Sequence, residues 1–286
     1  MDGPIFIIGC GRTGSNLLEQ ILNNHSEIKL VPEMHFMTFW KKGLTDRLDK
    51  IGTLKKDKNL QKAVELMYSG ELIGDYWSKI DIDKRKLYEK FSDSDRSYRA
   101  LMEIIMKEHA KRNEKTHYGA KFPVHFSYLP TLFEWFPNAK SIHMIRDPRA
   151  IYASELKKDE KPNFPLKKKN PFYAYGILLY VLFQWKWAAK SHRCYKNRYA
   201  DKYRICKFED LILEPENTIE DICKFLEVDF EPEVLDVIMR GSSFEDSKDD
   251  GFKKEPLYRW KKTVSPLKKK VIRLILGSHM SDLKYL

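Results

Sequence analysis

An arginine inside a glycine-rich turn is the first feature of this chain that points to chemistry. Arg12 belongs to residues 9–16, GCGRTGSN, which follow an apolar run at 5–8 and precede apolar residues at helical spacing. Glycines let the backbone come close to an anion, and the first amides of a helix attract it. We therefore predict a phosphate-binding turn. Its expected donors are Arg12, Thr13, Gly14, Ser15 and Asn16.

The three glycines of this turn also have the GxGxxG spacing of dinucleotide-binding proteins. Glu33 follows the last of them by 19 residues, where an acid that binds a ribose is expected. The same residues fit the frame of a nucleotide-binding P-loop, but Ser15 stands where that motif has its lysine. An NAD(P)-dependent oxidoreductase of the Rossmann type is therefore one alternative. It leaves Arg12 in the turn unexplained.

A second arginine stands further along the chain, with a serine eight residues after it. Arg146 directly follows an expected strand at 141–145, and Ser154 lies on the helix expected next. A guanidinium fork and a hydroxyl on the first turns of a helix suit a phosphate group. The dinucleotide alternative does not account for this pair.

Short apolar runs alternate with helical patterns, which predicts an open, mostly parallel α/β sheet with flanking helices. Ligands of such sheets bind at the carboxyl ends of the strands, where both polar stretches lie. We expect one domain over 1–286, with a helical insertion at 36–112 that shapes the acceptor cleft. The expected strands are 5–8, 27–31, 118–122, 141–145 and 203–208, and a long aromatic helix is expected at 172–198.

Composition narrows the class of protein. The 52 lysines and arginines exceed the 41 acidic residues by 11, which suits an anionic ligand, an acidic substrate or nucleic acid. A nucleic-acid-binding module is a further alternative, but the basic residues are spread along the chain. The four cysteines have neither metal nor disulfide spacing. Because this cysteine pattern suits a reducing compartment and no signal peptide or integral membrane segment is visible, we predict a cytoplasmic protein. No metal-binding cluster is visible in the sequence, and we expect that the protein needs no metal.

Both polar stretches resemble those of one family. Residues 11–18 resemble the 5′-phosphosulfate loop of sulfotransferases that use 3′-phosphoadenosine 5′-phosphosulfate (PAPS), and residues 145–154 resemble their 3′-phosphate motif. The resemblance extends through residues 208–211 to the C-terminal helix and leaves out the insertion. In motif pattern it is closest to the tyrosylprotein and carbohydrate-type branch. It implies the P-loop NTPase-like sulfotransferase fold.

The resemblance also implies a reaction and a cofactor site. A sulfuryl group would pass from PAPS to an acceptor hydroxyl and leave 3′-phosphoadenosine 5′-phosphate (PAP). Arg12 would bind the 5′-phosphate and the sulfate, whereas Arg146 and Ser154 would hold the 3′-phosphate. Phe208 would contact the adenine, or would belong to the core. A protein that only binds the nucleotide, without catalysis, is a further alternative.

Glu33 and Lys121 are the catalytic residues that the resemblance implies, beside Arg12. Glu33 stands 21 residues after Arg12, as the catalytic glutamate of the tyrosylprotein branch does, and would act as the general base. A structural carboxylate and a ribose ligand are the alternatives for it. Lys121 resembles the catalytic lysine of that branch in a Lys-x-Pro setting. His35 and His125 are further candidates for the base.

The sequence does not specify the acceptor. A basic loop at 157–170 could steer an acidic acceptor, such as a glycan or an acidic peptide, or it could be a solvated flap. Three lysines of the tail, Lys248, Lys253 and Lys254, could close over the cofactor. We expect no nucleic-acid partner and leave the oligomeric state open.

Overall fold

The computed structural model describes residues 2–33, 35–37, 43–71, 80, 82–158, 172–236, 238–240, 248–250 and 252–286. Its elements in chain order are β1 (Ile5–Gly9), α1 (Ser15–Asn24), β2 (Ile28–Val31), α2 (Leu44–Ile51), α3 (Asp57–Tyr68), α4 (Lys84–Ser92), α5 (Tyr98–Arg112), β3 (His117–Lys121), the 3₁₀-helix η2 (Pro123–Tyr128), α6 (Leu129–Trp135), β4 (Lys140–Ile145), α7 (Pro148–Lys158), α8 (Tyr173–Arg198), β5 (Tyr203–Lys207), α9 (Phe208–Leu213), α10 (Pro215–Leu226), the 3₁₀-helix η3 (Pro232–Leu235), β6 (Ile238–Arg240), β7 (Lys248–Asp250), α11 (Glu255–Thr263) and α12 (Pro266–Asp282).

One open sheet carries the fold, with the strand order β2-β3-β1-β4-β5. β3 pairs in parallel with both β1 and β2, so that Ala120 lies opposite Phe6 and Gly119 lies opposite Leu30. The predicted α/β sheet with flanking helices is confirmed. A dinucleotide-binding sheet has the order 3-2-1-4-5, in which the second strand lies beside the first. Here β3 separates them, which disfavours the dinucleotide alternative.

The chain divides into two compact units. The first comprises Met1–Ile8 and Glu19–Ser141, and the second comprises Gly9–Leu18 and Ile142–Leu286. Because α1 begins at Ser15, its first turn belongs to the second unit and the rest of the helix belongs to the first.

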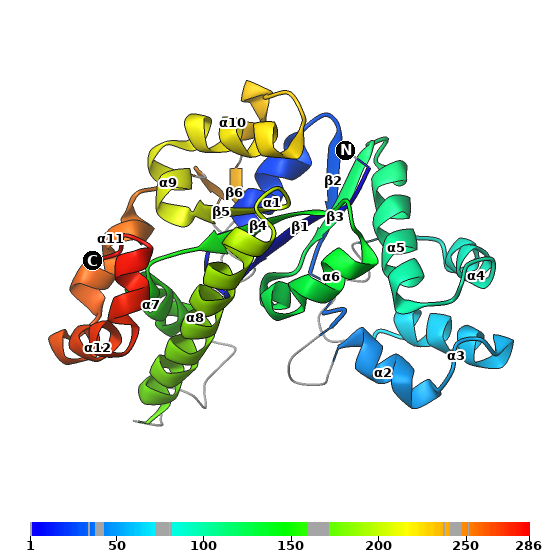
Figure 1. The fold of residues 1–286 in the computed structure, drawn as a ribbon, viewed down its shortest axis with the longest axis horizontal. Coiled ribbons are helices and arrows are strands. Elements are labelled where there is room, and N and C mark those ends of the chain that lie inside the picture. The colour runs from blue at the N-terminus through cyan, green and yellow to red at the C-terminus, as the bar shows by residue number, and fades with distance from the viewer. Residues whose placement is uncertain are drawn as a thin grey trace. The chain divides into compact units, whose positions relative to one another are not determined.

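The first unit contains the predicted helical insertion. Helices α2 to α5 follow one another between β2 and β3, and α5 contacts both of these strands (Figure 1). The β1 side chains at 5–8 are completely buried, as expected for a strand covered on both faces. In α3, the apolar residues Leu60, Val64 and Met67 are buried at helical spacing. The described part of the insertion therefore consists mainly of helices.

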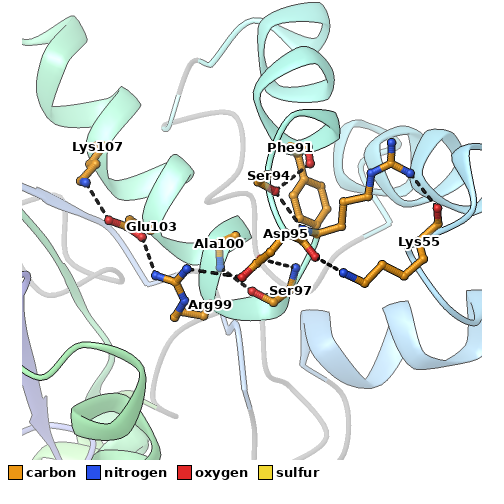
Figure 2. A network of polar contacts seen from close by, with 10 residues as sticks. Lys55, Phe91, Ser94, Asp95, Ser97, Arg99, Ala100, Glu103 and Lys107 are labelled. Carbon is orange, nitrogen blue, oxygen red and sulfur yellow. Dashed lines mark hydrogen bonds and ion pairs between the residues drawn. The ribbon is translucent and has the colours of Figure 1, made fainter.

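Polar contacts determine where α5 begins (Figure 2). Asp95 accepts a hydrogen bond of 2.9 Å from the amide of Ser97, whose own hydroxyl caps the helix. Arg99 then bonds Glu103 at 3.0 Å, and Glu103 pairs with Lys107 at 2.6 Å. Such partly exposed pairs at helical spacing add only about 0.2–0.5 kcal/mol each. The cap, at about 1 kcal/mol, therefore contributes more than any single pair to where α5 begins.

In the second unit, helix α7 contacts α8, α11 and α12, and α12 contacts α8 (Figure 1). The predicted aromatic helix is confirmed as α8, and Trp185 is its largest fully buried side chain. The fifth strand ends at Lys207, one residue earlier than predicted, and Phe208 begins α9 instead. The acidic residues that follow Phe208 favour a helix start, because they complement the positive end of the helix dipole.

Parts of the predicted loop and tail lie outside the described residues. They are residues 159–170 of the basic loop, and residues 242–247 and 251 of the tail. No helix among the residues that the structure describes is long and apolar enough to cross a membrane.

Candidate functional site

The glycine-rich turn adopts backbone conformations that few other residues tolerate. Gly14 has a φ of 90° and Arg12 a φ of 66°, both in the left-handed region. A Cβ atom on Gly14 would lie 2.3 Å from the ring of Phe208, and one on Gly9 would lie 2.4 Å from the carbonyl oxygen of Met144. Both glycines are therefore required by close packing as well as by conformation.

Helix α1 starts directly at this turn. The amide of Leu17 donates to the carbonyl of Gly14 at 3.0 Å, so the earlier amides of the helix have no intrahelical acceptor. The Thr13 hydroxyl donates to the carbonyl of Cys10 at 2.8 Å and holds the turn together. Ser15 and Asn16 form the first turn of the helix, where amides attract anions.

A hydrogen bond joins the two polar stretches that the sequence singles out. The Nε atom of Arg12 donates to Oγ of Ser154 on α7 at 3.0 Å. The two residues are 142 positions apart in the chain. The predicted 5′- and 3′-phosphate residues thus lie in contact within the second unit.

Arg146 is a buried cation at the end of β4. Its two terminal nitrogens donate to the backbone carbonyls of Arg12 at 3.2 Å and Pro256 at 2.7 Å. Its Nε atom is buried and has no hydrogen-bond partner among the described residues. The guanidinium carbon lies 4.1 Å from the centre of the Phe208 ring. Burial lowers the pKa of Arg146 to about 10, so the group remains charged at neutral pH.

Phe208 contacts both the glycine-rich turn and Arg146. We define Arg12, Gly14, Arg146, Ser154 and Phe208 as the phosphate cluster. The ring of Phe208 is buried, with 4% of the residue exposed, and lies against Gly14 and beneath the guanidinium of Arg146. An aromatic face stabilises a cation by about 0.5–2 kcal/mol. The ring therefore helps to keep Arg146 charged and in place.

The residues after Arg146 form a helix cap and a salt bridge. Asp147 accepts from the amide of Arg149 at 2.8 Å and pairs with its guanidinium at 2.7 Å. Arg149 also lies 4.0 Å from the centre of the Trp260 ring. Sequence reasoning gave no role to Glu209, which accepts from the amide of Asp147 at 3.0 Å. Its partner lies 62 positions away, and no local pattern indicates the contact.

The predicted catalytic residues lie in the first unit. The Nζ atom of Lys121, at the end of β3, lies 3.6 Å from Oε2 of Glu33 and 3.4 Å from Oε2 of Glu19. Lys121 is 3% exposed, so it is a buried cation between two carboxylates. His35 lies 3.6 Å from the other carboxylate oxygen of Glu33. We call Glu19, Glu33, His35 and Lys121 the carboxylate cluster.

Glu19 is the member of this cluster that sequence reasoning missed. It lies on α1, four residues after Ser15 and hence on the same face of the helix. This helical spacing from the predicted turn is the signal that could have identified Glu19 from the sequence.

His125 has a different character from the carboxylates. Its Nε2 accepts a hydrogen bond from the amide of Met37 at 3.0 Å, and its side chain is fully buried. Burial lowers the pKa of His125 to about 3. The imidazole is therefore neutral and already used as an acceptor, which does not suit a general base.

Comparisons with known proteins identify sulfotransferases that are similar to this chain. A 3-beta-hydroxysteroid sulfotransferase of Cavia porcellus is 27% identical over 139 residues, which are 46% of this chain and 46% of that protein. The chain spans about half the length of this protein and of three further sulfotransferases that it matches.

Two solved structures share the fold. The sulfotransferase domain of the Synechococcus PCC 7002 olefin synthase has a TM-score of 0.60 at 20% identity, over 96% of this chain and 94% of that one. A mouse sulfotransferase, SULT7A1, complexed with PAP, has a TM-score of 0.54 at 12% identity, over 98% of this chain and 84% of that one. The family model described as "Sulfotransferase family" matches residues 4–232, and the chain therefore belongs to the sulfotransferase family.

Proposed function

We propose that this chain transfers a sulfuryl group from PAPS to an acceptor hydroxyl and releases PAP. The observation that carries the proposal is Arg146, a buried guanidinium whose Nε atom has no hydrogen-bond partner among the described residues. A buried charge is costly unless it is paired, so this position favours an anionic ligand. The contact of Arg12 with Ser154 adds a second cation and a hydroxyl to the same cluster.

The phosphate cluster fits the two ends of such a cofactor. When bound, PAPS supplies the sulfuryl group. The amides of the turn at 13–16 and the guanidinium of Arg12 would hold the 5′-phosphosulfate. Arg146 and Ser154 would hold the 3′-phosphate, and Phe208 keeps the guanidinium of Arg146 in place from beneath. Charge-assisted hydrogen bonds of this kind are about twice as strong as neutral ones.

Glu33 is the base in this proposal. Its carboxylate takes the proton of the acceptor hydroxyl, which frees the acceptor oxygen for attack. Lys121 supplies positive charge where negative charge develops. Once Glu33 is protonated, the Lys121 ammonium loses the negative charge of Glu33 and keeps that of Glu19. Glu19 therefore allows Lys121 to remain an ammonium through the reaction.

The acceptor is a hydroxyl compound of undetermined structure. A named relative acts on a 3-beta-hydroxysteroid, and the excess of 11 positive charges is compatible with an acidic acceptor instead. We propose that the insertion at 36–112 helps to shape the acceptor site of a single catalytic domain. The cytoplasmic location stays a prediction that depends on the cysteine pattern.

Two measurements test this function. Calorimetry with PAP, NAD and a DNA duplex separates the alternatives, and we expect binding of PAP alone. Transfer of labelled sulfate from PAPS to a panel of steroids, lipids, glycans, peptides and small alcohols then identifies the acceptor. Binding of NAD or DNA without binding of PAP would overturn the proposal. Binding of PAP without transfer to any acceptor would favour a protein that only binds the nucleotide.

A further inference from the structure

The backbone next to Arg146 is held from two sides within the second unit. The indole nitrogen of Trp185 donates to the carbonyl of Arg146 at 2.9 Å. The amide of the next residue, Asp147, donates to Oε1 of Glu209 at 3.0 Å. These two contacts determine the direction in which the chain leaves β4. They therefore determine where the Arg146 side chain starts.

Glu209 is itself held by Tyr285, the residue before the last of the chain. The hydroxyl of Tyr285 donates to Oε2 of Glu209 at 2.9 Å. Its backbone carbonyl accepts from the guanidinium of Arg149 at 2.8 Å, and its ring centre lies 6.3 Å from that of Trp185. One residue thus contacts three side chains that surround the end of β4.

The end of α12 fixes the position of Tyr285. Lys284 has a φ of 58°, and the amide of Tyr285 donates to the carbonyl of Met280 at 2.8 Å. A left-handed residue followed by such a bond back into the helix is the usual way to end a helix and turn the chain. The tyrosine is therefore placed by a defined turn.

The surroundings of Glu209 make this contact important. The carboxylate is partly buried, and burial raises the pKa of Glu209, whereas the amide of Asp147 and the Tyr285 hydroxyl both favour its charged form. Loss of the hydroxyl would leave one partly buried carboxylate oxygen without this donor. Such losses cost more than a surface hydrogen bond contributes.

We propose that Tyr285 is a positioning residue of the 3′-phosphate site, acting through Glu209 and the Asp147 amide on Arg146. This inference rests on the proposed function, since it assumes that Arg146 binds the 3′-phosphate. It assigns the segment that follows α12 an indirect part in ligand binding, through Glu209 and Arg146. The Tyr285 hydroxyl serves to keep a partly buried carboxylate oriented toward the strand end.

The test compares two nucleotides on two matched variants. Tyr285→Phe removes only the hydroxyl, and calorimetry measures its affinity for PAP and for adenosine 5′-monophosphate, which lacks the 3′-phosphate. We expect about a tenfold loss for PAP and little change for the monophosphate. Tyr203→Phe is the control, because it removes another buried hydroxyl of the same unit, which contacts His143 and His192. It should lower the unfolding temperature without changing the preference for PAP.

The possible outcomes distinguish a wrong role for Tyr285 from a wrong proposed function. Equal losses for both nucleotides, or an unchanged PAP affinity in folded Tyr285→Phe, would overturn the role of Tyr285. If the unaltered protein binds PAP no better than the monophosphate, the 3′-phosphate site is wrong and the proposed function fails with it. A thermal unfolding scan of each variant shows whether a loss of affinity is a loss of folded protein.

Discussion

The phosphate cluster and the carboxylate cluster hold their charges in different ways. In the phosphate cluster, Arg146 is held by two backbone carbonyls at 2.7 and 3.2 Å and by an aromatic face. In the carboxylate cluster, Lys121 lies 3.4 and 3.6 Å from two carboxylates that can each gain a proton. Backbone carbonyls do not titrate, so the first arrangement keeps one charge state.

This difference separates a binding role from a proton-transfer role. A preorganised guanidinium binds an anion with little reorganisation, because the contacts that orient it already exist before binding. An ammonium between two carboxylates tolerates the protonation of either one, since the other remains as its partner. We therefore expect changes in the phosphate cluster to affect affinity and changes in the carboxylate cluster to affect turnover.

The largest expected effect is that of Glu33→Gln. The amide keeps the shape of the side chain but cannot accept a proton, so turnover should fall by roughly 10²–10⁴. The affinity for PAP, measured by calorimetry, should not change. Glu103→Gln is the control, because the Glu103 carboxylate pairs with Arg99 and Lys107 on α5. Undiminished turnover in Glu33→Gln would remove Glu33 from the role of base.

Arg146→Ala should have the converse effect. Removal of the buried guanidinium that we propose to bind the 3′-phosphate should weaken PAP binding by about a hundredfold, whereas turnover at saturating PAPS should change far less. Calorimetry and initial rates measure the two quantities. If turnover falls as much as affinity does, the division of roles between the two clusters is wrong.

Gly14→Ala tests the packing beneath the phosphate cluster. The new Cβ would meet the Phe208 ring at 2.3 Å, and we expect a loss of about 2 kcal/mol in the free energy of unfolding. Gly176→Ala on α8 is the matched control, because a Cβ there meets nothing within 4 Å. It should be neutral or stabilising by up to about 1 kcal/mol. Equal stabilities by denaturant unfolding would contradict the close contact at Gly14.

Stability should also decrease in mild acid, in both units. Burial lowers the pKa of His125 and of His143 to about 3 each, from an ordinary value of 6.5. In the unfolded chain, the two imidazoles therefore bind protons near pH 6.5, whereas in the folded chain they stay neutral at this pH. The stabilisation is complete above pH 6.5 and is lost as the pH falls toward 3, by about 2 kcal/mol per histidine at pH 5. Urea unfolding between pH 7.5 and 5 measures this slope, and His125→Gln should reduce it.

The smallest expected effect is that of Glu19→Gln. Lys121 keeps Glu33 as a partner but loses the carboxylate that remains when Glu33 is protonated. We expect kcat to fall by about tenfold, as for one charged hydrogen bond, with an unchanged KM for PAPS. Glu19→Asp should restore part of kcat if the charge is what matters. A change in KM alone would place Glu19 with the binding residues instead.

Local patterns in the sequence determine much of this fold. The apolar run at 5–8 and the mainly apolar segment at 141–145 predict strands, and the glycines of the turn predict an anion site, because both depend on near neighbours in the chain. The choice of Arg12, Arg146 and Ser154 also follows from sequence, through resemblance to a family that the comparison confirms. The end of β5 was predicted one residue late, because helix and strand signals overlap at Phe208.

Only the tertiary structure determined which polar side chains contact one another. The contact of Arg12 with Ser154 spans 142 positions, and that of Tyr285 with Glu209 spans 76. The order β2-β3-β1, which separates this sheet from a dinucleotide-binding one, is equally a matter of long-range pairing. Such contacts depend on how distant segments pack, and neither periodicity nor spacing encodes them. The sequence thus determined the turn and its arginine, and the folded chain determined the partners that hold both.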